Sequence, residues 1–182
     1  KKISSQLKSN GKKVVHCHGV FDLLHLGHIK HFEEARSLGD ILIVTVTPDN
    51  FVRKGPNRPV FTTQLRLEAI AALEVVDYVA ANDWPEAIKT IKALQPAVYC
   101  KGPDYKNHSD DITGKINDEK KIVESLGGEI YYTQDITFSS SNLLNKYGFV
   151  QNKSQKDFIK KMLSGQDIEH IKTCIEKFQK FN

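Results

Sequence analysis

Five short apolar runs rich in β-branched and aromatic residues alternate with segments of helical spacing, and this alternation limits the possible folds most strongly. The runs, each expected to be a strand, are 14–18, 41–47, 76–81, 97–101 and 129–133. The expected helices are 28–38, 63–73, 85–94 and 115–126. Strands that alternate with helices require right-handed crossovers and form a parallel sheet. The sequence therefore predicts an α/β fold with a Rossmann-like, doubly wound, five-stranded parallel sheet.

Length and composition fit one main domain with a short extension. Of the 182 residues, 40% are hydrophobic and 26% are charged, proportions typical of a folded globular protein. We expect a nucleotide-handling main domain over residues 1–150. From 151 to 182 the chain is lysine-rich, and its apolar residues recur at the spacing of two amphipathic helices. This helical extension is interpreted either as an appendage of the main domain or as a connector to a missing domain or a dimer contact.

Charge, cysteine content and hydropathy argue against several classes of protein. The net charge of +4 is mild, and the lysines are spread along the chain, which argues against a nucleic-acid partner. No apolar stretch approaches the ~20 residues that span a bilayer, so we expect a cytoplasmic protein with no membrane partner. Three widely spaced cysteines indicate neither a disulfide framework nor a zinc site. A homodimer is expected only because two-fold dimers are the commonest assembly.

The segment 19–28 (GVFDLLHLGH), between the first strand and the first helix, carries the strongest functional motif. Gly19 and Gly27 allow backbone to approach a ligand closely, and a helix N-terminus offers free N–H groups and positive potential to phosphate. His25 and His28 are three residues apart, so near a helix start they share a face and can donate to phosphate oxygens. We therefore predict a phosphate site with His25 and His28 as catalytic residues.

The loop after the second strand is basic and is interrupted by glycine and proline. It contains Lys54 and Arg58, which can clamp either a triphosphate or the phosphate of a second substrate. Lys54 is predicted to be catalytic, and Arg58 to bind substrate together with Asp49. Arg66, on the following helix, is a weaker candidate for substrate binding.

The ends of the fourth and fifth strands add further candidates. Lys101 is predicted to be a catalytic cation, while Asp104 can either hydrogen-bond a base or help to hold a hydrated Mg²⁺. After the fifth strand, a serine run precedes an apolar helical segment, where serines act as helix caps and can also bind phosphate. The predicted nucleotide ligands of this run are Ser139, Ser140 and Ser141.

The motif at 19–28 resembles that of the nucleotidyltransferase superfamily, in the form found in its cytidylyltransferase-like branch. Together with 101–105 (KGPDY), 126–129 (LGGE) and 139–144 (SSSNLL), it is most similar to the adenylyltransferase domain of bifunctional heptose-phosphate kinase/adenylyltransferases. The resemblance implies that Val20, Phe21 and Asp22 also contribute to nucleotide binding. The sequence departs from the pattern of that family at three places. The family often has Asn at the position of His18, Gly at that of Pro103, and Ser-Thr-Thr where this chain has three serines.

What the resemblance implies is transfer of a nucleoside monophosphate, with ATP and heptose 1-phosphate as substrates and pyrophosphate as a product. A sugar kinase domain is then the expected fused partner. A sugar-phosphate oxygen would attack the α-phosphorus directly, with Mg²⁺ carried by the nucleoside triphosphate rather than by a dedicated protein site. The main alternative is a CTP-dependent cytidylyltransferase that acts on glycerol 3-phosphate or another polyol phosphate. A nucleotide-binding regulatory module is the alternative outside enzymes.

Overall fold

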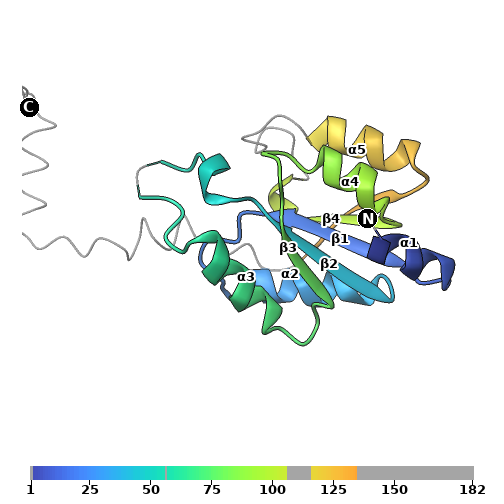
Figure 1. Ribbon diagram of the computed structural model, residues 1–182, viewed down its shortest axis with the longest axis horizontal. Helices are drawn as coiled ribbons and strands as arrows, with labels where there is room; N and C mark the ends of the chain where they lie inside the picture. Colours follow the sequence, from blue (N-terminus) through green and yellow to red (C-terminus); the bar gives the residue numbers. More distant parts are fainter. Residues whose placement is uncertain (1, 56, 106–115, 135–182) are drawn as a thin grey trace, which may run out of the picture. The chain divides into compact units, whose positions relative to one another are not determined.

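A single parallel sheet forms the centre of the protein, whose computed structural model describes residues 2–55, 57–105 and 116–134 (Figure 1). Its strands are β1 (Val14–Gly19), β2 (Ile41–Val46), β3 (Tyr78–Ala81), β4 (Val98–Lys101) and β5 (Glu129–Tyr132). They lie in the order β3-β2-β1-β4-β5, and every neighbouring pair is parallel. This confirms the predicted five-stranded doubly wound sheet. The strand order reverses between β1 and β4, at the middle of the sheet.

Helices cover both faces of the sheet (Figure 1). The helices α2 (Leu26–Ser37) and α3 (Thr63–Ala71) pack on one face, and α4 (Ile88–Leu94) and α5 (Ile116–Ser125) on the other. Thr62 caps α3, because its side chain accepts a hydrogen bond from the backbone N–H of Leu65. Two 3₁₀ turns, η1 (Asp49–Phe51) and η2 (Pro103–Tyr105), follow β2 and β4. Four predicted helices are therefore confirmed, with ends shifted by up to a few residues.

One further helix, α1 (Lys2–Ser9), precedes the first strand and was not predicted from the sequence. Its sequence, KISSQLKS, is amphipathic, but it contains only two apolar residues, Ile3 and Leu7, in eight positions. Ser4 is 3% exposed, and its hydroxyl donates to the carbonyl of Leu94 at 2.7 Å. The helix is thus fixed to the end of α4 by a polar tertiary contact, which no local pattern reveals.

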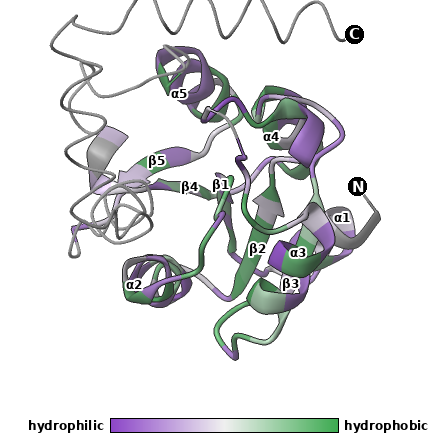
Figure 2. Ribbon diagram, turned by 90° about the vertical axis from the view of Figure 1, so that its left-hand side faces the viewer, coloured by the Kyte–Doolittle hydropathy of each residue, from purple (hydrophilic) through white to green (hydrophobic). Residues whose placement is uncertain are grey.

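The face of the sheet under α2 and α3 carries the apolar core. Side chains at alternate strand positions point into it, as the two-residue period of a strand requires. The strands β1 and β2 run between the helix pairs, and β2 is mostly hydrophobic along its length (Figure 2). Members of this core are Val15, Cys17, Phe32, Ala35, Leu42, Val44, Val46, Ile70, Val98 and Cys100. Removal of these apolar side chains from water supplies most of the driving force for folding.

The opposite face of the sheet is also buried but mixes apolar and polar side chains. A second apolar cluster, formed by Ala87, Ile91, Tyr99 and Val123, covers part of it. His16 Nε2 and His18 Nδ1 both lie within hydrogen-bond distance of the Thr45 hydroxyl, at 2.8 and 2.9 Å. Burial, followed by the charge of Lys101, lowers the pKa of His18 to about 3. Burial also places the pKa of His16 well below its usual range. Both rings are therefore neutral near pH 7.

The predicted division at residue 150, the helical extension 151–182 and the serines 139–141 lie outside the described residues and stay predictions. Within the described ranges, no helix combines the length and apolar character that crossing a bilayer requires. The same ranges contain no group of three or more His, Cys, Asp or Glu side chains arranged to hold a metal ion.

A first prediction concerns Gly39, at the turn between α2 and β2. A Cβ there would lie 2.7 Å from both the Lys13 carbonyl oxygen and Val15 Cγ2, so backbone has to move to admit it. We expect Gly39→Ala to lower the free energy of unfolding by about 1–3 kcal/mol, measured by urea denaturation. Gly102→Ala is the matched control, because a Cβ at Gly102 meets no described atom within 4 Å. Equal stability of the two variants would contradict this reading.

A second prediction concerns acid stability. Burial lowers the pKa of His18 and His28 to about 3 and that of His31 to about 4, each below the value of an unfolded chain. The unfolded state therefore takes up protons first, and stability is complete above about pH 6.5 and falls as pH drops towards 4. Each histidine contributes a loss of up to about 1.4 kcal/mol per pH unit. Urea denaturation at pH 7.5, 6 and 5 should show this loss, and His31→Gln should reduce its slope.

Candidate active site

The junction between β1 and α2 brings the two motif histidines together. His25 is the N-cap of α2, with extended backbone, and its carbonyl accepts the backbone N–H groups of His28 at 2.9 Å and Ile29 at 3.2 Å. The His25 and His28 rings stack, with centroids 3.8 Å apart and planes 21° from parallel. The pair therefore lies at the helix N-terminus, where N–H groups without helical partners favour an anion.

Phe21 fixes the shape of this junction. Its backbone has a φ of 47°, a conformation that costs a non-glycine residue energy and that often occurs at functional sites. Its ring packs edge-on against Phe32 and His28, with centroid distances of 5.0 and 5.4 Å. A Cβ at Gly19 would lie 2.9 Å from the Phe21 ring, so this close approach requires glycine. Phe21 thus orients His28 from the core, while the predicted nucleotide contact of its side chain stays untested.

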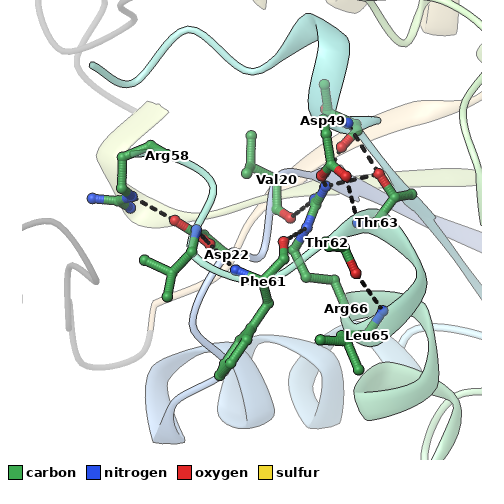
Figure 3. Close-up of polar contacts among 11 residues, drawn as sticks. Val20, Asp22, Asp49, Arg58, Phe61, Thr62, Thr63, Leu65 and Arg66 are labelled. Atoms are coloured by element: carbon green, nitrogen blue, oxygen red, sulfur yellow. Dashed lines mark hydrogen bonds and ion pairs between the residues drawn. The ribbon is translucent and has the colours of Figure 1, made fainter. Parts of the chain in front are cut away.

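The Asp22 carboxylate, whose predicted contact with nucleotide stays untested, is directed into the protein (Figure 3). One oxygen accepts from the backbone N–H groups of Val60 and Phe61, and the other from Arg58 Nε at 2.5 Å. Asp22 is 2% exposed. In this structure its carboxylate therefore holds the basic loop against the motif, a setting that the sequence does not reveal.

Arg66 occupies the centre of this region (Figure 3). It is 1% exposed, and its five N–H groups all find acceptors within the protein. These acceptors are the carbonyls of Val20, Thr47 and Phe61, the Asp49 carboxylate and the Thr63 hydroxyl. The structure thus gives Arg66 a different setting from the predicted substrate contact, because no donor of its guanidinium is left for a ligand. Asp49, also a predicted substrate ligand, is its ion-pair partner at 2.6 Å.

Lys54 and Arg58 lie in the same electrostatic environment as the histidine pair. Desolvation, then the charges of His25, His31 and Lys54, lowers the pKa of His28 to about 3. The pKa of Lys54 is also lowered, first by desolvation and then by Arg58, while Asp22 opposes this. Four predicted site residues are therefore coupled electrostatically, His28 with His25 and Lys54, and Lys54 with Arg58. We call His25, His28, Lys54 and Arg58 the basic cluster.

Two buried nitrogens of the basic cluster lack a hydrogen-bond partner among the described residues. They are Nδ1 of His28 and Nη2 of Arg58. Buried polar atoms are normally paired, and exceptions concentrate at functional sites. Two nitrogens in a cluster with a lysine and a helix N-terminus suit an anionic ligand such as phosphate.

Lys101 ends β4 as predicted, but its ammonium does not lie in the basic cluster. It forms an ion pair with Glu119 of α5 at 3.2 Å, where both side chains are less than 10% exposed. It also lies 4.3 Å from the centroid of the Tyr105 ring, and the Tyr99 hydroxyl donates to Glu119 at 3.1 Å. Lys101 is therefore held against α5 in this structure, and its predicted catalytic role stays a prediction.

Other predicted residues are placed only in part. Gly27 lies in the first turn of α2, and Val20 contributes its carbonyl to Arg66. The position of the Asp104 side chain is not described, so both of its proposed roles remain open. Two histidines that were not predicted to be site residues are coupled to Lys101: burial, then Lys101, lowers the pKa of both His18 and His31. The signal for His18 was available, since it departs from the family pattern directly before Gly19.

Comparison with known proteins agrees with this geometry. Residues 16–171 match the cytidylyltransferase-like family. The chain is 39% identical over 158 residues to "Bifunctional protein HldE" of Citrifermentans bemidjiense, covering 86% of the chain and 28% of that protein. It is 40% identical over 131 residues to the protein of the same name in Aliarcobacter butzleri, covering 70% of the chain and 27% of that protein. The chain thus spans little more than a quarter of these relatives.

Solved structures show the same fold. A lipopolysaccharide core biosynthesis protein from Thermoplasma volcanium is 31% identical, with a TM-score of 0.57 over 70% of this chain and 100% of its own. Pantothenate synthetase from Thermus thermophilus is 15% identical, with a TM-score of 0.51 over 85% of this chain and 68% of its own, and shows the fold alone. The resemblance stated from the motifs is thereby confirmed. With its stacked histidine pair at the start of α2 and a match over most of its length, the chain belongs to the cytidylyltransferase-like family.

Proposed function

We propose that the protein transfers a nucleoside monophosphate from ATP to a sugar 1-phosphate, with a heptose 1-phosphate as the expected acceptor, and releases pyrophosphate. One observation carries the proposal: the basic cluster gathers two imidazoles, an ammonium and a guanidinium at a helix N-terminus. The similarity to proteins named bifunctional HldE supports a sugar-phosphate acceptor. Nucleotidyl transfer, as the general reaction, follows from membership of the family.

The chemistry requires charge stabilisation rather than a covalent enzyme intermediate. An oxygen of the sugar phosphate attacks the α-phosphorus, the bond to the bridging oxygen of the leaving pyrophosphate breaks, and negative charge shifts to that leaving group. The attacking phosphate is already anionic near neutral pH, so no general base is needed. His25 and His28 donate to phosphate oxygens from the helix N-terminus, and Lys54 neutralises charge on the incoming or leaving oxygens.

The low pKa of His28 is compatible with this role. A neutral imidazole carries one N–H, which donates either to the backbone at Leu23 or to a phosphate oxygen. Donation to both requires the protonated ring, a form that a bound phosphate anion would favour. The adjacent cations, Lys54 and Arg58, then supply the positive charge, while the imidazoles supply hydrogen bonds of fixed direction. Mg²⁺ bound to the triphosphate would add Lewis-acid stabilisation, and its ligands would come chiefly from the phosphates.

The choice of nucleotide and the assembly remain part of the proposal. CTP with a polyol phosphate is the competing pair, since the motif at the start of α2 is common to both branches. Because the relatives are named bifunctional and are much longer than this chain, we propose a fused sugar kinase as partner. A homodimer and a cytoplasmic location complete the proposal.

Pyrophosphate release tests the reaction directly. With Mg²⁺ present, we expect release when ATP is combined with a heptose 1-phosphate, and little with CTP. The panel should include hexose 1-phosphates and glycerol 3-phosphate, because these represent the two acceptor classes. Faster release with CTP and glycerol 3-phosphate would assign the competing reaction, whereas nucleotide binding without release across the panel would favour a regulatory module.

The basic cluster can be tested by substitution. We expect His28→Ala and Lys54→Ala each to lower kcat by about 10²–10³, the usual effect of removing one donor to developing charge. Lys12→Ala is a matched control, because Lys12 is about half exposed and precedes β1 at the opposite end of the strand. Turnover near the wild-type rate with both substrates saturating would remove the substituted residue from the proposed mechanism.

A further inference from the structure

A row of polar side chains runs along α2 from the basic cluster towards the end of β5. His28, His31 and Glu34 are each three residues apart, so they lie on adjoining parts of one side of the helix. Burial, then His25 and then His31, lowers the pKa of His28, as expected for neighbouring rings. The row therefore connects the basic cluster to the middle of the same helix.

His31 contacts the residue that follows β5. Its Nδ1 atom lies 2.9 Å from the hydroxyl oxygen of Thr133, a residue that is only 2% exposed. The backbone N–H of Thr133 donates to the Lys101 carbonyl at 3.0 Å, and its hydroxyl donates to the same carbonyl at 3.3 Å. Because that hydroxyl has one proton, His31 is the donor in its own contact with Thr133. The chain beyond β5 is thus joined to both α2 and β4.

Glu34 holds both the next residue and the strand itself. Its two carboxylate oxygens lie within hydrogen-bond distance of the backbone N–H of Gln134, at 3.0 and 3.2 Å. The hydroxyl of Tyr131 donates to one of the same oxygens at 3.0 Å. Hydrogen bonds to a carboxylate are stronger than those between neutral groups. We call His31 and Glu34, with their contacts to residues 131–134, the α2–β5 clamp.

The α2–β5 clamp joins the two sides of the crevice in which a nucleotide is expected. In a doubly wound sheet the ligand lies beyond the carboxyl ends of the strands where their order reverses, here between β1 and β4. The β1 side of this crevice carries the N-terminus of α2 with its histidine pair. The ends of β4 and β5 form the other side. Because the clamp residues belong to the same helix as the histidine pair, they set the distance between the two sides.

We propose that His31 and Glu34 are positioning residues for the nucleotide, because they keep the end of β5 at a fixed distance from the basic cluster. The inference rests on the proposed function and adds the residues that prepare the nucleotide side of its site. Neither side chain has to touch the nucleotide. A site whose two sides are already in place loses less conformational entropy on binding than a site that its ligand must order. The serine run predicted to bind nucleotide begins five residues after Gln134 in the sequence.

Calorimetric titration of the 182-residue protein with ATP and Mg²⁺ tests the α2–β5 clamp without turnover, because no acceptor is present. We expect Glu34→Ala to raise the Kd for ATP about tenfold, the equivalent of about one hydrogen bond, and His31→Ala to act in the same direction. In the pyrophosphate assay, the KM of Glu34→Ala for ATP should rise similarly, while its KM for the sugar phosphate changes by less than about twofold. Glu34→Gln, which keeps one acceptor oxygen, should give an intermediate Kd and serves if the alanine variant does not fold.

Glu33→Gln is the matched control, because Glu33 precedes Glu34 on α2 but its exposed carboxylate pairs with Lys30 of the same helix. It should leave the Kd for ATP and both KM values unchanged. A purely structural role of Glu34 leads to a different result, namely lower stability in urea with an unchanged Kd of the folded variant for ATP. That result, or an equal rise of KM for both substrates, would overturn the inference.

The titration separates this inference from the proposed function, because binding requires no turnover. Weaker ATP binding by Glu34→Ala, in a protein that releases no pyrophosphate with any acceptor, would contradict the proposed function and support the α2–β5 clamp. Pyrophosphate release by the wild type, with equal Kd and KM values for ATP in wild type and Glu34→Ala, would support the function and overturn the inference. Preferred binding of CTP, weakened in the same way by Glu34→Ala, would change the nucleotide of the proposed function and also support the clamp.

Discussion

The guanidinium of Arg66 is the contact on which the geometry of the site depends. It joins the ends of β1 and β2, through the carbonyls of Val20 and Thr47, to the loop at Phe61 and to Asp49. Main-chain carbonyls at strand ends have no ladder partner, and leaving them unpaired when buried costs free energy. A planar group with five donors in fixed directions satisfies two of them and the loop carbonyl of Phe61 at once, whereas a lysine offers three donors without this fixed geometry. Asp22 extends this arrangement by holding Arg58 and the amides of the same loop.

The two faces of the sheet are both buried, but they differ in polarity. The face under α2 and α3 is apolar and includes Phe21, whose ring reaches from the core to His28. The face under α4 and α5 carries His16, His18 and the buried pair of Lys101 with Glu119. Breaking a buried ion pair leaves an uncompensated charge and is strongly destabilising, so Lys101 also contributes to the fold. The site lies where these two environments meet, at the carboxyl edge of β1.

The sequence predicted the fold class, the five strands and four of the helices, because these follow from periodicity and from crossover geometry. It also predicted that His25 and His28 lie together, since a spacing of three at a helix start determines this. What it did not reveal were the partners of the charged residues. Arg66, Asp22 and Lys101 have the residue types expected of ligands, yet their polar atoms meet partners distant in sequence, which no local pattern encodes. The helix α1 was missed because its amphipathic pattern covers only eight residues, and the contact of Ser4 with Leu94 that fixes it lies across the fold.

The burial of the histidine rings has a consequence for the electrostatic potential of the site. Burial keeps the pKa values of His18, His28 and His31 at about 4 or below, so these rings are uncharged throughout the near-neutral range. The positive potential therefore comes from lysine and arginine side chains and from the N-terminus of α2, which do not change their charge there. The protein thus presents nearly the same potential to a phosphate group across this range. Variation of ligand affinity with acidity then reports the ionisation of the ligand rather than that of the protein.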